Sequence, residues 1–264
     1  MPSEQALRVT GLGTLVKVRW HAAARRLTLR VSQTRRAVIV TMPQHSSLDD
    51  ADRFVAKHID WVKQRLDAMP QPVPFADGVV IPYRGTPHLI RFAGPSRGKS
   101  VVTIANVKAA REAQREAKDR GIAKWRQKPD EKYLPHLVVR GHAEHAPRRL
   151  RDWLVGEAKA RIVERVDFHA ERLGLKYRQV AMRDQTSRWG SCSSSRVLSF
   201  SWRLILAPAF VLDYVAAHEV AHLKEMNHGP RYWALLARTY PDLEEARRWL
   251  HREGASLHAY GRED

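Results

Sequence analysis

The 264-residue chain contains a single cysteine, Cys192, and no long run of apolar residues. One thiol excludes an internal disulfide framework and a zinc site built mainly from cysteine. The missing apolar run argues against a membrane-spanning helix, and residues 1–13 lack the apolar core of a secretory signal. Because 44% of the residues are hydrophobic and eight are Trp, we expect a folded, cytoplasmic protein without a membrane span.

Acidic residues are also scarce, at 28 against 46 Lys and Arg, which gives a formal net charge of +18. A surplus of this size favours contact with polyanions, so nucleotides and nucleic acid are candidate partners. The basic residues are, however, spread from Arg8 to Arg262, and the chain carries no recognisable nucleic-acid-binding motif. The charge alone therefore does not assign a partner.

The first 105 residues have the pattern of a β-rich region with one helix. Apolar residues alternate or cluster in short segments that are bounded by polar or turn residues, as in strands. The helix is expected from the N-cap candidates of residues 46–50 to about Ala68. The expected strands are residues 15–20, 26–31, 37–42, 78–82, 87–92 and 100–104.

The composition changes at residue 106. Residues 106–133 are charged and alanine-rich with almost no apolar face, which predicts a charged helical or mobile insertion. A strand at 135–141 and a long amphipathic helix from about Pro147 to the residue before Gly174 follow. Three further helices are expected at 208–226, 230–239 and 241–252. The predicted fold class is α+β, with a β-rich region 1–105, the insertion 106–133 and a mainly helical region 134–264.

The segment His218-Glu219-Val220-Ala221-His222 is an H-E-x-x-H motif within a continuous apolar stretch. Two histidines four residues apart lie on one face of a helix, where both imidazoles can bind one metal ion. Glu219 follows the first histidine and can reach the attacking water without occupying a coordination position. The pattern predicts a metal hydrolase with His218 and His222 as ligands and Glu219 as general base.

A catalytic zinc ion normally has three protein ligands, and both Glu225 and His228 are candidates for the third. On a continuous helix Glu225 would lie roughly 10 Å from His218 along the axis, too far for both to reach one ion. His228 requires the helix to end, and Asn227 with Gly229-Pro230 supplies a turn that would do so. We therefore predict a zinc site of His218, His222 and His228.

Two further residues are candidates for substrate binding. Tyr232 lies one helical turn beyond His228 and could place a phenol near a developing oxyanion, although packing is the more common use of such a side chain. Arg188 precedes a Trp-Gly-Ser-Cys turn and could bind a substrate carboxylate or phosphate. We interpret the turn as a tight hairpin, with a loop whose N–H groups face the metal as the alternative.

With these residues identified, the sequence resembles the YgjP-like metallopeptidase family, relatives of the SprT proteins. The resemblance rests on Ser187-Arg188-Trp189-Gly190-Ser191-Cys192-Ser193, on Asp213-Tyr214-Val215 before the H-E-x-x-H motif, and on Asn227-His228-Gly229-Pro230-Arg231-Tyr232-Trp233. It implies a zincin-like catalytic region in 134–264, or one family domain over the whole chain. It also implies Zn²⁺ on the three histidines, a catalytic Glu219 and a peptide or protein substrate.

Two other functions are compatible with the same residues. The metal could serve a nucleotide pyrophosphohydrolase, since the chemistry of zinc does not distinguish acyl from phosphoryl centres. Alternatively, the zinc could be structural in a nucleic-acid-associated protein. Structural zinc normally has four protein ligands and only three are evident, so we favour a zinc metallopeptidase.

Overall fold

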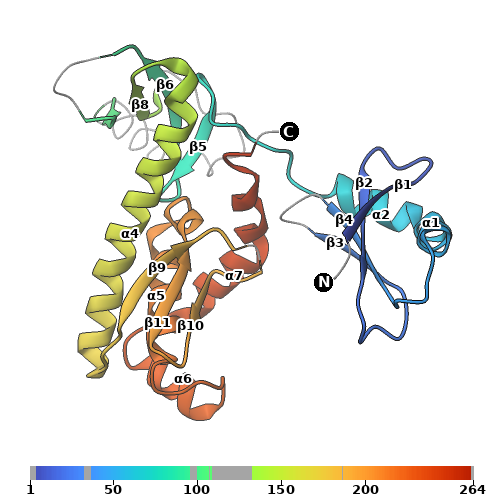
Figure 1. The fold of residues 1–264 in the computed structure, drawn as a ribbon. Helices are drawn as coiled ribbons and strands as arrows, with labels where there is room; N and C mark the ends of the chain where they lie inside the picture. The colour runs from blue at the N-terminus through green and yellow to red at the C-terminus, as the bar shows by residue number, and fades with distance from the viewer. Residues whose placement is uncertain are drawn as a thin grey trace, which may run out of the picture. The chain divides into compact units, whose positions relative to one another are not determined.

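The computed structural model describes residues 4–32, 37–95, 100–106, 108, 133–185 and 187–262. These form two compact units, Met1–Gln71 and Pro72–Asp264, both drawn in Figure 1. Three sheets and both long and short helices make up a mixed α+β fold, as predicted. The predicted insertion 106–133 lies outside the described residues except for Asn106, Lys108 and Tyr133.

Unit 1 is one four-stranded sheet with two helices. The strands β1 (Glu4–Arg8), β2 (Leu15–Trp20), β3 (Thr28–Ser32) and β4 (Ala37–Met42) lie in the order β1-β2-β4-β3, with β2 and β4 parallel. Side chains on alternate positions, such as Val16 and Val18 in β2, are fully buried. They pack with apolar residues of the helices in a core formed by this unit alone.

The helix expected from residue 46 to about Ala68 is present but divided. α1 spans Leu48–Lys57 and α2 spans Ile59–Asp67, with His58 between them in a non-helical conformation. Ser47 caps α1, because its side chain accepts from the Asp50 N–H while the Asp50 carboxylate accepts from the Ser47 N–H. The periodicity of the sequence therefore predicted the helical segment but not its break.

Unit 2 holds two sheets. β5 (Val80–Tyr83), β6 (Thr86–Ala93), β7 (Val102–Ala105) and β8 (His136–Arg140) lie in the order β5-β6-β8-β7, so β8 joins strands from before residue 106. The composition change at residue 106 thus lies within unit 2. The second sheet has the order β10-β11-β9, from β9 (Gln179–Arg183), β10 (Gly190–Cys192) and β11 (Val197–Ser201).

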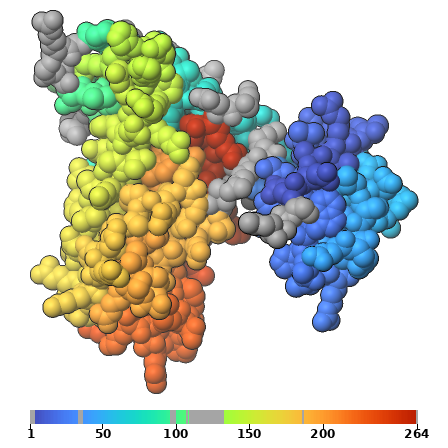
Figure 2. Space-filling model, viewed as in Figure 1, coloured from blue at the N-terminus to red at the C-terminus, as the bar shows by residue number. Residues whose placement is uncertain are grey.

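The long helix α4 (Ala146–Leu173) lies against the second sheet and against α5 (Ala209–Ala221) (Figure 1). Figure 2 shows residues of α4 and of the second sheet side by side on one face of the unit. The apolar stripe at every fourth position of α4 is buried, and Gly174 ends the helix in the left-handed conformation with φ 65°, as predicted. The stripe comprises Leu150, Leu154, Ala158, Ile162, Val166 and Ala170.

The remaining helices follow α5 in the chain. They are α6 (Pro230–Ala237) and α7 (Leu243–Glu253), and short 3-10 turns at Trp202–Ile205 and Gly254–Ala259 complete the unit. β1, β9 and β10 were not predicted as strands. Among the described residues, the strands β2 to β8 lie within two residues of their expected ends. No helix among the described residues is long and apolar enough to cross a membrane.

Candidate metal centre

The helix α5 places three residues of the H-E-x-x-H motif. It is apolar on nearly every side, because it lies between α4, β10 and α7. Glu219 and His222 are buried, at 5% and 8% exposure, and His218 is half-buried. A largely enclosed helix therefore holds His218 in its last turn, and His222 follows directly as the C-cap residue.

The end of α5 differs from the expectation. The helix was predicted to reach Met226, but it ends at Ala221 and continues as hydrogen-bonded turns, in which the Glu225 N–H donates to the Ala221 carbonyl (3.1 Å). Asn227 was expected to use the left-handed conformation. Instead, the Gly229 N–H donates to the Asn227 carbonyl (2.8 Å), and Asn227 is not among the described residues with positive φ. The chain still turns back, and α6 begins at Pro230 as predicted.

The turn brings His228 to the two motif histidines. The His228 Nε2 atom lies 3.1 Å from Nε2 of His222 and 3.1 Å from Nε2 of His218. Nitrogen ligands on one tetrahedral zinc ion would lie about 3.3 Å apart, given Zn–N bonds of about 2.0–2.1 Å. Among the described residues, these three side chains form the group of potential ligands close enough to share one ion.

The protonation of the histidines suits a metal. His222 Nδ1 lies 3.0 Å from the Glu225 carbonyl, which can only accept, so Nδ1 carries the proton and Nε2 keeps its lone pair. Burial lowers the pKa of His222, and burial with the neighbouring charges lowers the pKa of His218 to about 3. Both imidazoles are therefore neutral at physiological pH, as metal ligation requires. The donor set fits Zn²⁺.

Aromatic side chains of α6 support the three histidines. The fully buried Tyr232 ring lies within 5.3 Å of all three imidazole centroids, and its hydroxyl donates to the His218 carbonyl (3.1 Å). The Trp233 indole N–H donates to the His228 carbonyl (3.0 Å). The Tyr232 phenol is thus engaged by the helix backbone, and the geometry favours packing over oxyanion binding for this residue.

Glu219 lies against the backbone of β10. A Cβ atom on Gly190 would lie 2.5 Å from Glu219 Oε1 and 2.6 Å from its Cγ, so only glycine leaves room for this carboxylate. Burial raises the pKa of Glu219 to about 8, and the positive charge of the exposed Arg188 opposes that shift. The structure therefore brings Arg188, predicted to bind substrate, near the carboxylate.

The predicted Trp-Gly-Ser-Cys turn is the edge strand β10 of a hairpin. It pairs antiparallel with β11, and the turn itself follows at residues 193–196. Trp189 stacks on the buried His258 ring, with centroids 5.0 Å apart. The interpretation as a hairpin is thus right for the fold, and the alternative, a loop whose N–H groups face the metal, stays a prediction.

Two residues beside the site were missed from the sequence. Tyr214 lies one turn before His218 on the same face of α5, with its hydroxyl 3.4 Å from His218 Nδ1. That i, i+4 spacing could have identified it. Asp213 accepts from His169 (2.7 Å) and Arg165 of α4 and so ties the motif helix to the long helix. No local pattern signals this second contact, because it joins residues more than 40 positions apart.

Comparisons with known proteins identify a family for most of the chain. A family model described as YgjP-like, metallopeptidase domain, matches residues 25–253. The crystal structure of the metallopeptidase zymogen of Pyrococcus abyssi abylysin is 19% identical, with 34% of this chain and 90% of that chain covered and a TM-score of 0.31. A likeness of this size carries no argument. No curated protein matches the chain.

The family match runs through both compact units and includes β10, the H-E-x-x-H helix and the turn to His228. It gives no support to the nucleic-acid partner considered from the charge. It does confirm the resemblance seen in the residues around the three histidines. A matched domain of this extent, together with a site whose donor set fits a metal, shows that the chain belongs to the YgjP-like metallopeptidase family.

Proposed function

We propose that this protein is a zinc-dependent peptidase, with His218, His222 and His228 as metal ligands and Glu219 as general base. The observation that carries the proposal is the convergence of three imidazole Nε2 atoms beside a buried carboxylate. Three ligands favour a catalytic ion, because structural zinc normally has four, and the described residues offer no fourth within reach.

Each group has a separate role in the reaction. When bound, Zn²⁺ would supply a Lewis acid that polarises the scissile carbonyl and acidifies water. The Glu219 carboxylate takes a proton from the attacking water and returns it to the leaving amine. Arg188, whose charge acts on Glu219, opposes the effect of burial and favours the ionised form that a base needs.

The edge of β10 supports a peptide as the substrate. Trp189 and Ser193 bond to β11 through their backbones, so the antiparallel register turns the N–H and C=O groups of Gly190 and Cys192 outward. These groups lie at the end of the sheet order, next to Glu219. An extended peptide that pairs with this edge would present its backbone to the carboxylate.

The test compares the zinc-loaded protein with its Glu219→Gln variant on a library of unfolded proteins and peptides. We expect cleavage by the wild type and a loss of about 10²–10⁴-fold in the variant, because general-base catalysis contributes that much. The variant should keep its zinc, since Glu219 is not a ligand. A wild type without peptidase activity that instead releases phosphate from nucleoside triphosphates would replace this proposal with the nucleotide hydrolase.

A further inference from the structure

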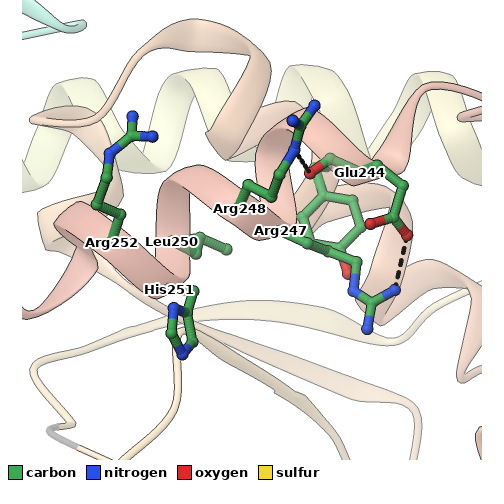
Figure 3. Close-up of a pocket in the computed structure, with 7 residues that line it drawn as sticks. Glu244, Arg247, Arg248, Leu250, His251 and Arg252 are labelled. Carbon is green, nitrogen blue, oxygen red and sulfur yellow. Dashed lines mark hydrogen bonds and ion pairs between the residues drawn. The ribbon is translucent and has the colours of Figure 1, made fainter.

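A shallow, open cleft of about 840 Å³ lies along α7. Figure 3 shows the helix residues that line it, with the guanidinium groups of three arginines extending from α7. One wall is Tyr214 of α5. The other lining residues are Glu244, Arg247, Arg248, Leu250, His251 and Arg252.

The cleft borders the residues that hold the histidines. Its wall residue Tyr214 has its hydroxyl 3.4 Å from His218 Nδ1. The Arg247 guanidinium lies 5.2 Å from the centre of the Trp233 ring, and Trp233 donates to the His228 carbonyl. Arg247 thus lies beside aromatic groups that contact two of the three predicted ligands. A substrate bound at the metal that extends past Tyr214 or Trp233 would reach the cleft.

The cleft carries more positive than negative charge. Arg247 pairs with the Glu244 carboxylate at 2.8 Å. Arg248 donates through Nε to the Glu244 backbone carbonyl (3.3 Å), and the described residues place no carboxylate within ion-pair distance of it. Arg252 pairs with the neighbouring Glu253 (2.8 Å), so Arg248 is the lining arginine without an ion pair among the described residues, and its guanidinium keeps donors for another anion.

We propose that this cleft selects peptide substrates that carry a carboxylate near the scissile bond, bound by Arg248 and Arg247. The inference rests on the proposed peptidase function and adds the class of its substrate. A planar guanidinium matches a carboxylate in two parallel hydrogen bonds, which makes Arg suited to this task. The carboxylate comes from an Asp or Glu side chain or from the C-terminus of the peptide.

The first experiment separates these two sources. The zinc-loaded protein cleaves a set of peptides identical except for Glu or Gln at each position around the scissile bond, each with a free or an amidated C-terminus. We expect kcat/KM to be roughly tenfold higher for the peptide with the recognised carboxylate, as for charge-assisted hydrogen bonds. Salt should reduce this preference. Equal cleavage of all peptides would overturn the inference and leave the peptidase function intact.

Variants test the named residues. Arg248→Met should abolish the preference by raising KM for the carboxylate peptide alone. Glu244→Gln removes the anion that competes for Arg247, so the preference should increase about threefold, as expected for a partly exposed ion pair. As a control, Arg172→Met removes an exposed arginine of α4 and should change neither KM nor the preference for the carboxylate peptide. If Arg248→Met lowers kcat/KM equally for acidic and neutral peptides, Arg248 has a structural role and the inference is overturned.

Binding provides a readout independent of catalysis. In zinc-loaded Glu219→Gln, calorimetric titration should show that the carboxylate peptide binds about tenfold more tightly than its neutral counterpart. If acidic peptides bind in this way but are not cut by the wild type, the carboxylate site in the cleft is supported and the proposed peptidase function fails. A different result would overturn the inference in favour of a nucleotide ligand. In that case a nucleoside triphosphate would bind more tightly than any acidic peptide, and Arg248→Met would abolish that binding.

Discussion

Gly190 and Glu219 come from opposite sides of the candidate site, and their contact leaves no space for a side chain on the strand. We predict that Gly190→Ala moves the Glu219 carboxylate or β10 and lowers kcat about 100-fold, because a displacement of about 1 Å of a catalytic group can cost that much. Peptide cleavage measures the loss of kcat, and the thermal unfolding midpoint shows whether the substitution also destabilises the fold.

A matched control is available in the same unit. A Cβ atom on Gly156 in α4 would meet open space, so Gly156→Ala should leave cleavage unchanged and stabilise the helix by about 0.5–1 kcal/mol. If Gly190→Ala cleaves peptides at the wild-type rate, Glu219 does not depend on the close approach of β10.

Tyr232 offers a second test at this scale. Because its hydroxyl donates to the His218 carbonyl, Tyr232→Phe should lower the free energy of unfolding by about 1 kcal/mol and reduce kcat less than tenfold. A phenol that stabilises an oxyanion would be expected to cost about 10²–10³-fold. The ratio of kcat values, measured with zinc-saturated protein, distinguishes the two roles.

The individual residues of the site were predictable where spacing alone decides the geometry. The spacing of the motif predicted that His218 and His222 lie on one helix face, and the choice of His228 over Glu225 agrees with the convergence of the three imidazoles. The reason given for that choice was only partly right. The helix ends before Glu225, and the carbonyl of Glu225 orients His222.

Between elements, the contact of α4 with α5 has a pH-dependent component. Burial raises the pKa of Asp213, but hydrogen bonds from His169 and Arg165 outweigh it and lower the pKa overall. A folded-state pKa below the unfolded one contributes stability that is present above the unfolded pKa of about 3.9 and is lost as pH falls through the folded pKa. The hydrogen bonds from His169 and Arg165 to Asp213 should therefore weaken only at acidic pH.

We predict that Asp213→Asn lowers the free energy of unfolding by about 2 kcal/mol at neutral pH, because it removes one partner of a partly buried charged network. The difference from the wild type should shrink below pH 4, where Asp213 of the unfolded chain takes up a proton, and should vanish as pH falls through the lower folded-state pKa. Chemical denaturation across this pH range measures it. Asp152→Asn, at an exposed position of α4, is the control. An equal effect at every pH would contradict the assignment.

The elements were predictable in proportion to their length and apolar periodicity. The stripe of α4 and the strands β2 and β4 were predicted within two residues. β10 was not, because three residues of Gly, Ser and Cys have no strand pattern of their own. Its conformation comes from pairing with β11, a tertiary contact that local sequence does not encode.

On the scale of the whole molecule, the two compact units have separate cores. The buried residues of the unit 1 core end at Val62, and those of the unit 2 core begin at Phe75. We predict that the fragment 72–264 unfolds cooperatively and binds one zinc ion with the affinity of the full chain. Circular dichroism and zinc titration test this, and a fragment without a cooperative transition would show that unit 1 is needed for folding.

Sequence composition did not mark this division. The charged stretch after residue 106 stood out, whereas the boundary at Gln71–Pro72 carries only the proline-rich connector of residues 70–74. The pairing of β6 with β8 crosses the charged stretch, and such non-local pairing is not visible in a local pattern. Composition therefore located the change at residue 106, but it did not show which residues share a core. That depends on strand pairing, such as the pairing of β6 with β8.

The account depends on the three-histidine centre, and a calorimetric titration of zinc into the metal-free protein tests it most directly. We predict one zinc ion per chain for the wild type and binding weakened more than about 100-fold in His228→Ala, through the loss of a ligand. Glu225→Ala should bind within about threefold of the wild type, because only its backbone carbonyl contacts His222. Unchanged affinity in His228→Ala, or a large loss in Glu225→Ala, would contradict the proposed centre.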